Sequence, residues 1–208
     1  MTQPLLPAEW APQSGVQLTW PHAGTDWAYM LDEVQACFLR IAREIAARQR
    51  LLIAAPDPDD VKRQIADTVR MDNVRLVQCP TNDTWARDHG AITLLCDGQP
   101  RLLDFKFNGW GLKFAADKDN LITRRLVEAG ALHGAYENRL GFVLEGGSIE
   151  SDGCGTLLTT SECLLSPNRN GQMTQTEIDA YLRRTFGVRQ VLWLDYGYLA
   201  GDDTDSHI

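Results

Sequence analysis

The order of apolar and polar residues predicts strands and helices that alternate along most of the chain. Residues 16–20, 51–55 and 74–77 are short apolar runs of the kind that form buried strands. Between residues 26 and 48 the apolar side chains fall three or four positions apart, which predicts a long amphipathic helix. That spacing is set by Trp27, Met30, Leu31, Val34, Phe38, Ile41 and Ile45.

Capping residues predict where two further helices begin and end. Asp57-Pro58 supplies an N-cap and a first-turn proline for a helix that runs to about Val69. Thr174 and Glu177 have the spacing of a capping box, so a helix should begin there and end near Phe186-Gly187. Both signals are local, because they depend on residues that are neighbours in the sequence.

The second half of the chain predicts a hairpin and further strands. Residues 91–95 and 102–107 flank residues 97–100, which predicts a hairpin whose loop is slightly longer than the tightest type. Residues 142–144 and 156–160 predict strands on either side of a glycine-rich stretch. The remaining predicted elements are a helix over 118–129 and a strand over 191–194. Two strands, a helix and a strand recur in this order, so we expect one mixed α/β domain over residues 1–208.

Composition and charge narrow the range of partners. The chain has 208 residues, a formal net charge of −8 and a pI of about 4.9. Such an acidic surface argues against nucleic acid and anionic membranes, and it favours a cationic substrate. No run reaches the ~18 apolar residues of a membrane span, and residues 1–10 lack the basic and apolar regions of a signal peptide. The oligomeric state stays open, and a homo-oligomer is allowed.

Cysteine usage favours a cytoplasmic protein with reduced thiols. The five cysteines are widely spaced and form no C-x-x-C pair, which argues against disulfides and a structural zinc site. None has the basic or helix-terminal surroundings that activate a thiolate. They are Cys37, Cys79, Cys96, Cys154 and Cys163.

Two segments carry candidate chemistry. The tryptophan ring of Trp85 can stack on a planar cation, and the Asp88 carboxylate can accept paired hydrogen bonds from a guanidinium. The alternative is that Trp85 is a core anchor and that Arg87 and Asp88 form a surface ion pair. Glu145 follows an apolar strand and precedes two glycines, so we expect it to be partly buried and to need a cationic or hydrogen-bonding partner. Its alternative is an exposed glutamate in a β-turn.

The last residues form a third candidate cluster. In extended geometry Asp203, Asp205 and His207 would point to one face, because side chains alternate along a strand. Such a face could bind a metal or transfer protons, and the alternative is a solvated acidic tail.

These clusters belong to a series of motifs that covers nearly the whole chain: Glu9-Trp10-x-Pro12, Thr19-Trp20-Pro21, Trp27, Asn82–Gly90, Phe107–Gly111, Leu144–Ile149, Thr159–Asn170 and Gly201–His207. Taken together, these motifs resemble the agmatine deiminase family, also called Porphyromonas-type peptidyl-arginine deiminases, within the guanidine-modifying superfamily.

The resemblance implies a fold and a set of roles. The fold would be the α/β propeller (pentein) of five ββαβ-like blades, of which this chain would supply about the first three. Asp88 would grip the substrate guanidinium, and Glu145 would pair with His207, which would move protons. Trp85, Trp110 and Asp205 would contribute to substrate binding, and no metal or cofactor would be needed. The nucleophilic cysteine of the family would lie beyond Ile208, so we expect the chain alone to be inactive.

Four functions remain open on the sequence. The first is an agmatine deiminase that forms N-carbamoylputrescine and ammonia, and the second is an arginine or peptidyl-arginine deiminase. The third is a non-catalytic guanidinium-binding fragment. The fourth is a metal-dependent hydrolase that uses Asp203, Asp205 and His207. A dication such as agmatine suits an acidic enzyme, which favours the first.

Overall fold

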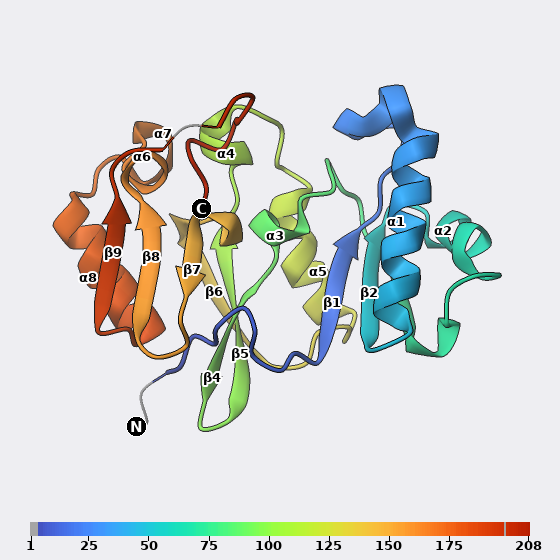
Figure 1. The fold of residues 1–208 in the computed structure, drawn as a ribbon, viewed down its shortest axis with the longest axis horizontal. Coiled ribbons are helices and arrows are strands. Elements are labelled where there is room, and N and C mark those ends of the chain that lie inside the picture. Colours follow the sequence, from blue (N-terminus) through green and yellow to red (C-terminus); the bar gives the residue numbers. More distant parts are fainter. Residues whose placement is uncertain (1–3, 198) are drawn as a thin grey trace. The chain divides into compact units, whose positions relative to one another are not determined.

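The computed structural model describes residues 4–197 and 199–208 (Figure 1). Its internal contacts group the chain into two compact units. Unit 1 is Met1–Ala11, Arg87–Ala116 and His133–Ile208, and unit 2 is Pro12–Ala86 and Asp117–Leu132. The single domain over residues 1–208 stays a prediction. Among the described residues, no helix is both long enough and apolar enough to cross a membrane.

Unit 2 is built on a parallel sheet in the order β1-β2-β3, formed by β1 (Gly15–Thr19), β2 (Arg50–Ala55) and β3 (Val74–Gln78). Successive side chains of the central strand β2 enter two different cores. One core packs against α1 (Leu31–Ala46) and α2 (Pro58–Ile65), and the other against α5 (Ile122–Glu128). A strand covered on both faces needs apolar side chains on both, which explains the continuous apolar run that predicted it.

Two helices of unit 2 are shorter than predicted. The stretch expected to be helical from residue 26 opens with a 3-10 helix over Asp26–Met30, and α1 begins only at Leu31. The Ala28 N–H donates to the Thr25 carbonyl three residues back, which is the tighter 3-10 pattern. The Thr25 hydroxyl donates to the His22 carbonyl (2.8 Å) and does not cap the helix. Asp57 caps α2 as predicted, because its carboxylate accepts from the Asp60 N–H at 2.9 Å.

The early end of α2 has a local cause. The Thr68 N–H donates to the Ile65 carbonyl only three residues back, which is the tighter 3-10 pattern, and α2 ends at Ile65. The helix predicted over 118–129 is likewise split into a 3-10 helix over Asp119–Leu121 and α5.

Unit 1 contains two further three-stranded sheets, β4-β5-β6 and β7-β8-β9. In each, the first pair of strands is antiparallel and the third strand is parallel to the second. The predicted order of two strands, a helix and a strand therefore describes these two sheets, whereas the sheet of unit 2 is parallel throughout. The strands are β4 (Ile92–Cys96), β5 (Gln99–Lys106), β6 (Ala135–Val143), β7 (Ile149–Ser151), β8 (Thr156–Thr160) and β9 (Gln190–Leu194).

The hairpin of unit 1 is tighter than predicted. Cys96 pairs with Gln99, so the loop is only Asp97-Gly98. Both loop residues have positive φ (54° and 73°), as the two central residues of a type I′ turn require. The prediction of a longer loop was wrong because Pro100 was placed in it, whereas Pro100 lies near the start of β5, opposite Leu95.

Strand β6 is longer than the predicted residues 142–144. Only its last two residues are buried, and the preceding ones are half-buried or exposed, so they carry no continuous apolar run. Helix α8 (Gln175–Phe186) begins at the predicted capping box and ends at Gly187, whose φ is 69°. Its buried residues Ile178, Leu182 and Phe186 pack with β5, β8 and β9 into one core.

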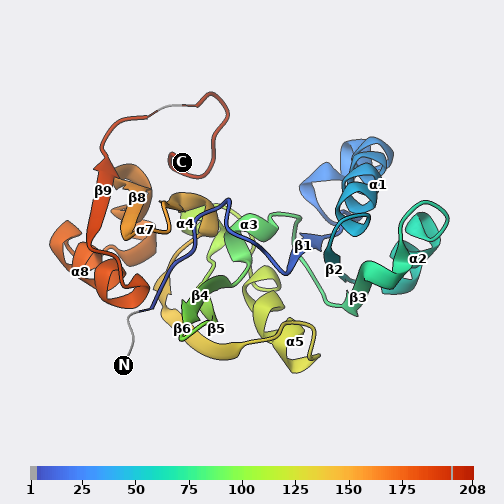
Figure 2. The same cartoon turned by 60° about the horizontal axis from the view of Figure 1, so that its bottom comes forward.

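The elements form a mixed α/β protein, as predicted. Short helices connect or follow the strands of unit 1: α4 (Gly109–Leu112), α6 (Ser161–Leu164) and α7 (Pro167–Asn170). Figure 1 shows the chain running from β9 back over the ends of β8 and β7 and ending beside β7, and Figure 2 shows the same return from a second direction. No sheet closes on itself within the described residues.

Candidate active site

Glu145 is fully buried at the end of β6, so the alternative of an exposed turn glutamate was wrong. The Leu144 N–H still donates to Lys106 in β5, and the chain then turns into a 3-10 helix over Gly146–Ser148. This position leaves the carboxylate inside unit 1. A buried carboxylate requires compensating donors, and the structure supplies them from a histidine and an arginine.

The two glycines that follow Glu145 permit close packing. A Cβ on Gly146 would lie 2.2 Å from the Arg87 carbonyl oxygen. A Cβ on Gly147 would lie 2.5 Å from Asp88 Oδ1 and 2.6 Å from His207 Nδ1. Any larger residue at 147 would therefore occupy the space where the aspartate and the histidine meet.

Asp88 lies on the short helix α3 (Ala86–His89) and is buried. Its Oδ1 accepts from the Gly147 N–H and its Oδ2 from the Trp110 indole N–H, both at 3.0 Å. Arg87 points elsewhere and pairs with Glu9 and Glu150, so the alternative of an Arg87–Asp88 surface pair was wrong.

Trp110 reaches Asp88 from an unusual backbone conformation. Its φ of 55° is positive, and it stands between Gly109 and Gly111, which also have positive φ. Non-glycine residues adopt this region only when their surroundings impose it. The Asn108 side chain provides part of that constraint, because it accepts from the Gly111 N–H at 3.0 Å.

His207 lies between the two carboxylates. Its Nε2 is 3.3 Å from Glu145 Oε2, and its Nδ1 is 3.6 Å from Asp88 Oδ1. Only 14% of its side chain is exposed, so the alternative of a solvated tail was wrong. The structure thus brings together Asp88, Glu145 and His207, three residues that lie far apart in the sequence.

The cluster contains two cations that sequence reasoning missed. Arg169, whose side chain is fully buried, donates from Nε to both oxygens of Glu145. It also pairs with Asp205 Oδ2 at 2.6 Å, while Lys113 Nζ lies 2.5 Å from Asp205 Oδ1. Both oxygens of Asp205 therefore bind cations of the chain itself, and its role in substrate binding stays a prediction.

The surroundings push the carboxyl pKa values in opposite directions. Burial raises the pKa of Asp88, and the charge of His207 and the Trp110 indole only partly offset it. Burial would also raise the pKa of Glu145, but the hydrogen bond with His207 and the charge of Arg169 outweigh it and lower that pKa. Two carboxyl groups whose pKa values are shifted in opposite directions, on either side of one histidine, are typical of acid–base sites.

The predicted alternation of Asp203, Asp205 and His207 on one face is not found. Asp205 and Ser206 both have a φ of 62°, so the segment is a turn and not an extended strand. Cys163 instead joins Glu145 and His207 in a group whose potential ligand atoms lie within 4.8 Å of one another. Arg169 already places a positive charge 3.0 Å from Glu145, which disfavours a metal cation there.

The two buried thiols, Cys79 and Cys163, are poor nucleophiles because burial keeps them protonated. Cys163 is fully buried and donates to Glu145 Oε2 at 3.5 Å. Burial and the negative charge of Glu145 raise the pKa of its thiol, which holds it in the neutral form. Burial likewise raises the pKa of Cys79.

Trp85 belongs to unit 2. It is 42% exposed and therefore not a core anchor, and its indole N–H donates to Asp83 Oδ2 at 2.9 Å. Asp119 supports the same loop, since its carboxylate accepts the backbone N–H groups of Asn82 and Asp83. The assignment of Trp85 to substrate binding stays a prediction.

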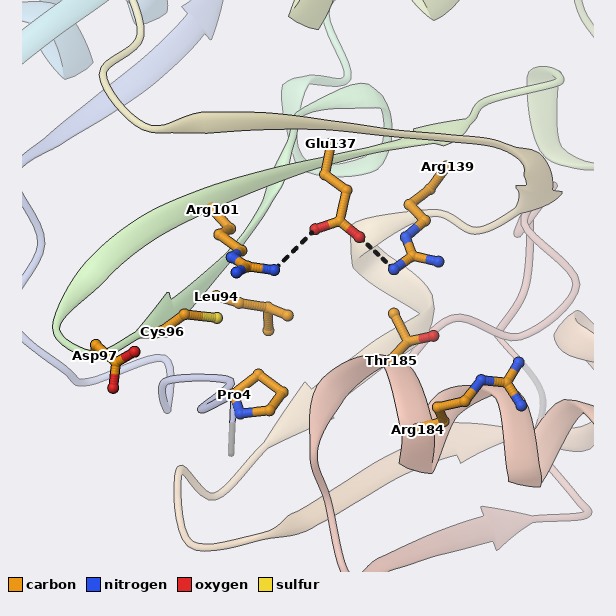
Figure 3. Close-up of a pocket in the computed structure, with 9 residues that line it drawn as sticks. All are labelled: Pro4, Leu94, Cys96, Asp97, Arg101, Glu137, Arg139, Arg184 and Thr185. Carbon is orange, nitrogen blue, oxygen red and sulfur yellow. Dashed lines mark hydrogen bonds and ion pairs between the residues drawn. The ribbon is translucent and has the colours of Figure 1, made fainter. Parts of the chain in front are cut away.

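A separate pocket of about 260 Å³ in unit 1 contains none of the predicted site residues. Figure 3 shows Glu137 between Arg101 and Arg139, pairing with both. Because this carboxylate already pairs with two of the pocket's arginines, we do not assign the pocket to the site. Its residues are Pro4, Leu94, Cys96, Asp97, Arg101, Glu137, Arg139, Arg184 and Thr185.

Comparison with known proteins supplies a family. The model of the Porphyromonas-type peptidyl-arginine deiminase family matches residues 5–208. The agmatine deiminase of Ectopseudomonas mendocina (strain ymp) is 37% identical over 212 residues, covering 98% of this chain and 55% of that protein. The chain thus spans little more than half the length of the curated relatives it matches.

Two solved structures are similar to the fold. The agmatine deiminase of C. jejuni, in a cysteine-to-serine variant with substrate bound, has a TM-score of 0.89 at 38% identity, covering 98% of this chain and 60% of that one. A Porphyromonas gingivalis protein, provisionally described as an arginine deiminase, has a TM-score of 0.89 at 53% identity, covering 99% and 61%.

Proposed function

The chain belongs to the Porphyromonas-type peptidyl-arginine deiminase family, and we propose on that basis that Asp88, Glu145 and His207 serve the hydrolysis of a guanidinium group. The observation that carries this proposal is the position of His207, within 3.6 Å of both carboxylates. A histidine held between two acids can donate and remove protons, and an additional carboxylate can orient a planar cation.

The charge of the cluster suits a cationic substrate. Asp88, Glu145 and Asp205 supply three negative charges, and Arg169 and Lys113 supply two positive ones. With a neutral histidine the cluster keeps one net negative charge, which a guanidinium would neutralise. Asp88 is the member without an ion pair to arginine or lysine among the described contacts, so we assign the clamp to it.

The proposed reaction follows from guanidinium chemistry. A guanidinium resists attack because its charge is delocalised, and it needs a strong nucleophile and an oriented carbon. A cysteine thiolate would attack that carbon, and His207 would donate a proton to the departing ammonia. His207 would then take a proton from water, and the resulting hydroxide would add to the carbon bound to sulfur. Cleavage of the carbon–sulfur bond would release the ureido product and regenerate the thiolate.

None of the five cysteines of this chain suits the nucleophile. The two buried ones have raised pKa values, and the family relative solved with substrate carries a cysteine-to-serine substitution. We therefore propose that the thiol is supplied from outside these 208 residues, and that the chain alone does not turn over. We also propose that the three sheets are blades of a propeller.

Two substrates compete. Agmatine is favoured by the curated relatives and by its two positive charges. Free or peptidyl arginine is favoured by the 53% identity to the Porphyromonas gingivalis protein. We rank agmatine first, because a substrate carboxylate would meet a negatively charged cluster.

Ligand binding to the 208-residue chain tests the proposal. The indole N–H of Trp110 contacts Asp88, so its NMR signal should move when a guanidinium binds. We expect agmatine to move it, and putrescine, an amine without the guanidinium, to leave it in place. Asp88→Asn should abolish the shift. If the chemical shift of the indole N–H stays unchanged with millimolar agmatine, arginine and peptidyl-arginine, the guanidinium site is refuted.

Turnover provides the second test. In any longer form of the protein that releases ammonia from agmatine, Asp88→Asn should lower kcat/KM by about two to four powers of ten. Ammonia release by the 208-residue chain itself, at about one turnover per second or faster, would overturn the assignment of the nucleophile.

A further inference from the structure

The Arg169 guanidinium forms five hydrogen bonds with the described residues of unit 1. Its Nε lies 3.1 and 3.0 Å from the two oxygens of Glu145, and its two terminal nitrogens donate to three further acceptors, one in each of three residues. One terminal nitrogen donates to Asp205 Oδ2 (2.6 Å) and the Cys163 carbonyl (3.3 Å), and the other to the Thr204 carbonyl (2.8 Å). The guanidinium therefore joins the end of β6 to the segment after β9.

The contacts on the C-terminal side lead directly to the histidine. Thr204, whose carbonyl Arg169 holds, accepts the His207 N–H on its hydroxyl at 3.0 Å. Asp202 closes the same turn by accepting the N–H groups of Thr204 (2.9 Å) and Ser206 (2.7 Å). Beyond it, the Ile208 N–H donates to the Gly147 carbonyl at 3.3 Å.

Arginine suits this position for a geometric reason. Its guanidinium presents five N–H donors in a rigid plane, whereas a lysine ammonium is a single point charge on a flexible stem. A lysine at 169 could neutralise Glu145 or Asp205, but it could not hold Glu145, Asp205 and the Thr204 carbonyl at the same time. The contacts therefore require the shape of arginine in addition to its charge.

We propose that Arg169 is a positioning residue that sets the distance between Glu145 and His207. One edge of its guanidinium fixes the orientation of the Glu145 carboxylate. The other holds Thr204 and Asp205, which carry the histidine into contact with that carboxylate. Its importance for turnover rests on the proposed function, but the placement of His207 can be measured without any reaction.

Two variants of the 208-residue chain test how Arg169 connects Glu145 to the C-terminal segment. Arg169→Lys keeps the charge and loses the planar donor set. Asp205→Asn removes the negative charge that pairs with Arg169 on the C-terminal segment and leaves the Glu145–Arg169 pair in place. In both, amide hydrogen exchange of His207 and Ile208 should become about tenfold faster or more, while α8 stays protected.

The imidazole supplies a spectroscopic readout that a purely structural role would not move. In the parent chain, long-range nitrogen–proton NMR spectra of His207 should show one ordered ring whose Nε2 faces Glu145. In both variants the imidazole signals should broaden, or the ring should change to the other tautomer. Arg183→Lys is the matched control, because Arg183 forms an exposed ion pair with Asp179 in the same unit, and it should alter neither readout.

The outcomes are decisive in either direction. Unchanged exchange and an unchanged His207 spectrum in both variants would overturn the proposal. Equal acceleration in α8 and in the C-terminal segment would also overturn it, because Arg169 would then support unit 1 as a whole. If Arg169→Lys fails to fold, Asp205→Asn still gives the answer. A failure to bind guanidinium compounds would refute the proposed function, but it would not affect this test of the role of Arg169.

Discussion

Replacing Glu145 by glutamine should destabilise unit 1 by about 3 kcal/mol at neutral pH. Breaking a buried ion pair typically costs about 3–5 kcal/mol, because the remaining charge stays buried without its partner. The lower end applies here, since Arg169 would keep Asp205 and two backbone carbonyls. The side chains of Glu145 and Arg169 both have no exposed surface, so solvent cannot replace the lost charge.

Urea unfolding followed by the signals of unit 1 measures this cost. With a urea dependence of about 2 kcal/mol per molar, the midpoint should fall by about 1.5 M. Glu44→Gln is the matched control: Glu44 also pairs with arginines, Arg43 and Arg48, but on an exposed helix surface. Exposed pairs contribute little, so the control midpoint should hardly move.

The effect should depend on pH with a defined sign. The pKa of Glu145 is lowered in the folded state, so the glutamate contributes stability above its unfolded pKa. That contribution is lost as the pH falls from about 4.3 through the folded pKa. The difference between the parent chain and Glu145→Gln should therefore be full at neutral pH and should shrink in acid. A midpoint equal to that of the parent chain at neutral pH would refute the buried-pair argument.

Three further outcomes follow from single contacts. Gly147→Ala should separate Asp88 from His207, because the new Cβ would lie within 2.6 Å of both side chains; loss of agmatine binding with a retained circular dichroism spectrum would show it. Trp110→Phe removes a hydrogen bond that lowers the pKa of Asp88, so carbon NMR of that carboxyl should show a still higher pKa. Burial raises the pKa of Asp119 to about 6, so the stability of unit 2 should fall as the pH rises from about 4 to 6, and Asp119→Asn should flatten that slope in urea titrations at several pH values.

The elements predicted best are those fixed by neighbouring residues. The capping box at Thr174 and the buried run of β2 depend on a few adjacent positions, and both appear where predicted. The first part of β6 was missed because its residues are half-exposed and pair with β5 through the backbone. A strand stabilised by distant partners leaves no local pattern of apolar residues.

The residues of the site also fall into those that the sequence reveals and those that it does not. Asp88, Glu145 and His207 could be selected by residue type and motif, and the structure places them together. Sequence reasoning required a partner for a buried Glu145 but could choose only the histidine. Arg169 stands in a polar stretch, Pro167–Asn170, which has the appearance of a solvated loop. Its side chain contacts Glu145 and the C-terminal segment, which are both distant in the sequence, so no local pattern reveals its burial.

The residues of the site come from segments that are distant in the sequence. Asp88, Glu145 and His207 each follow the third strand of a sheet along the chain: β3, β6 and β9, respectively. The three ionisable groups therefore come from three separate segments of the chain, and none of these segments contains the whole cluster. Segments between strands can carry polar groups that a strand interior would have to bury. If further sheets of the same kind follow in a longer form of the protein, the loop after the last strand of one of them is where we expect the nucleophilic thiol.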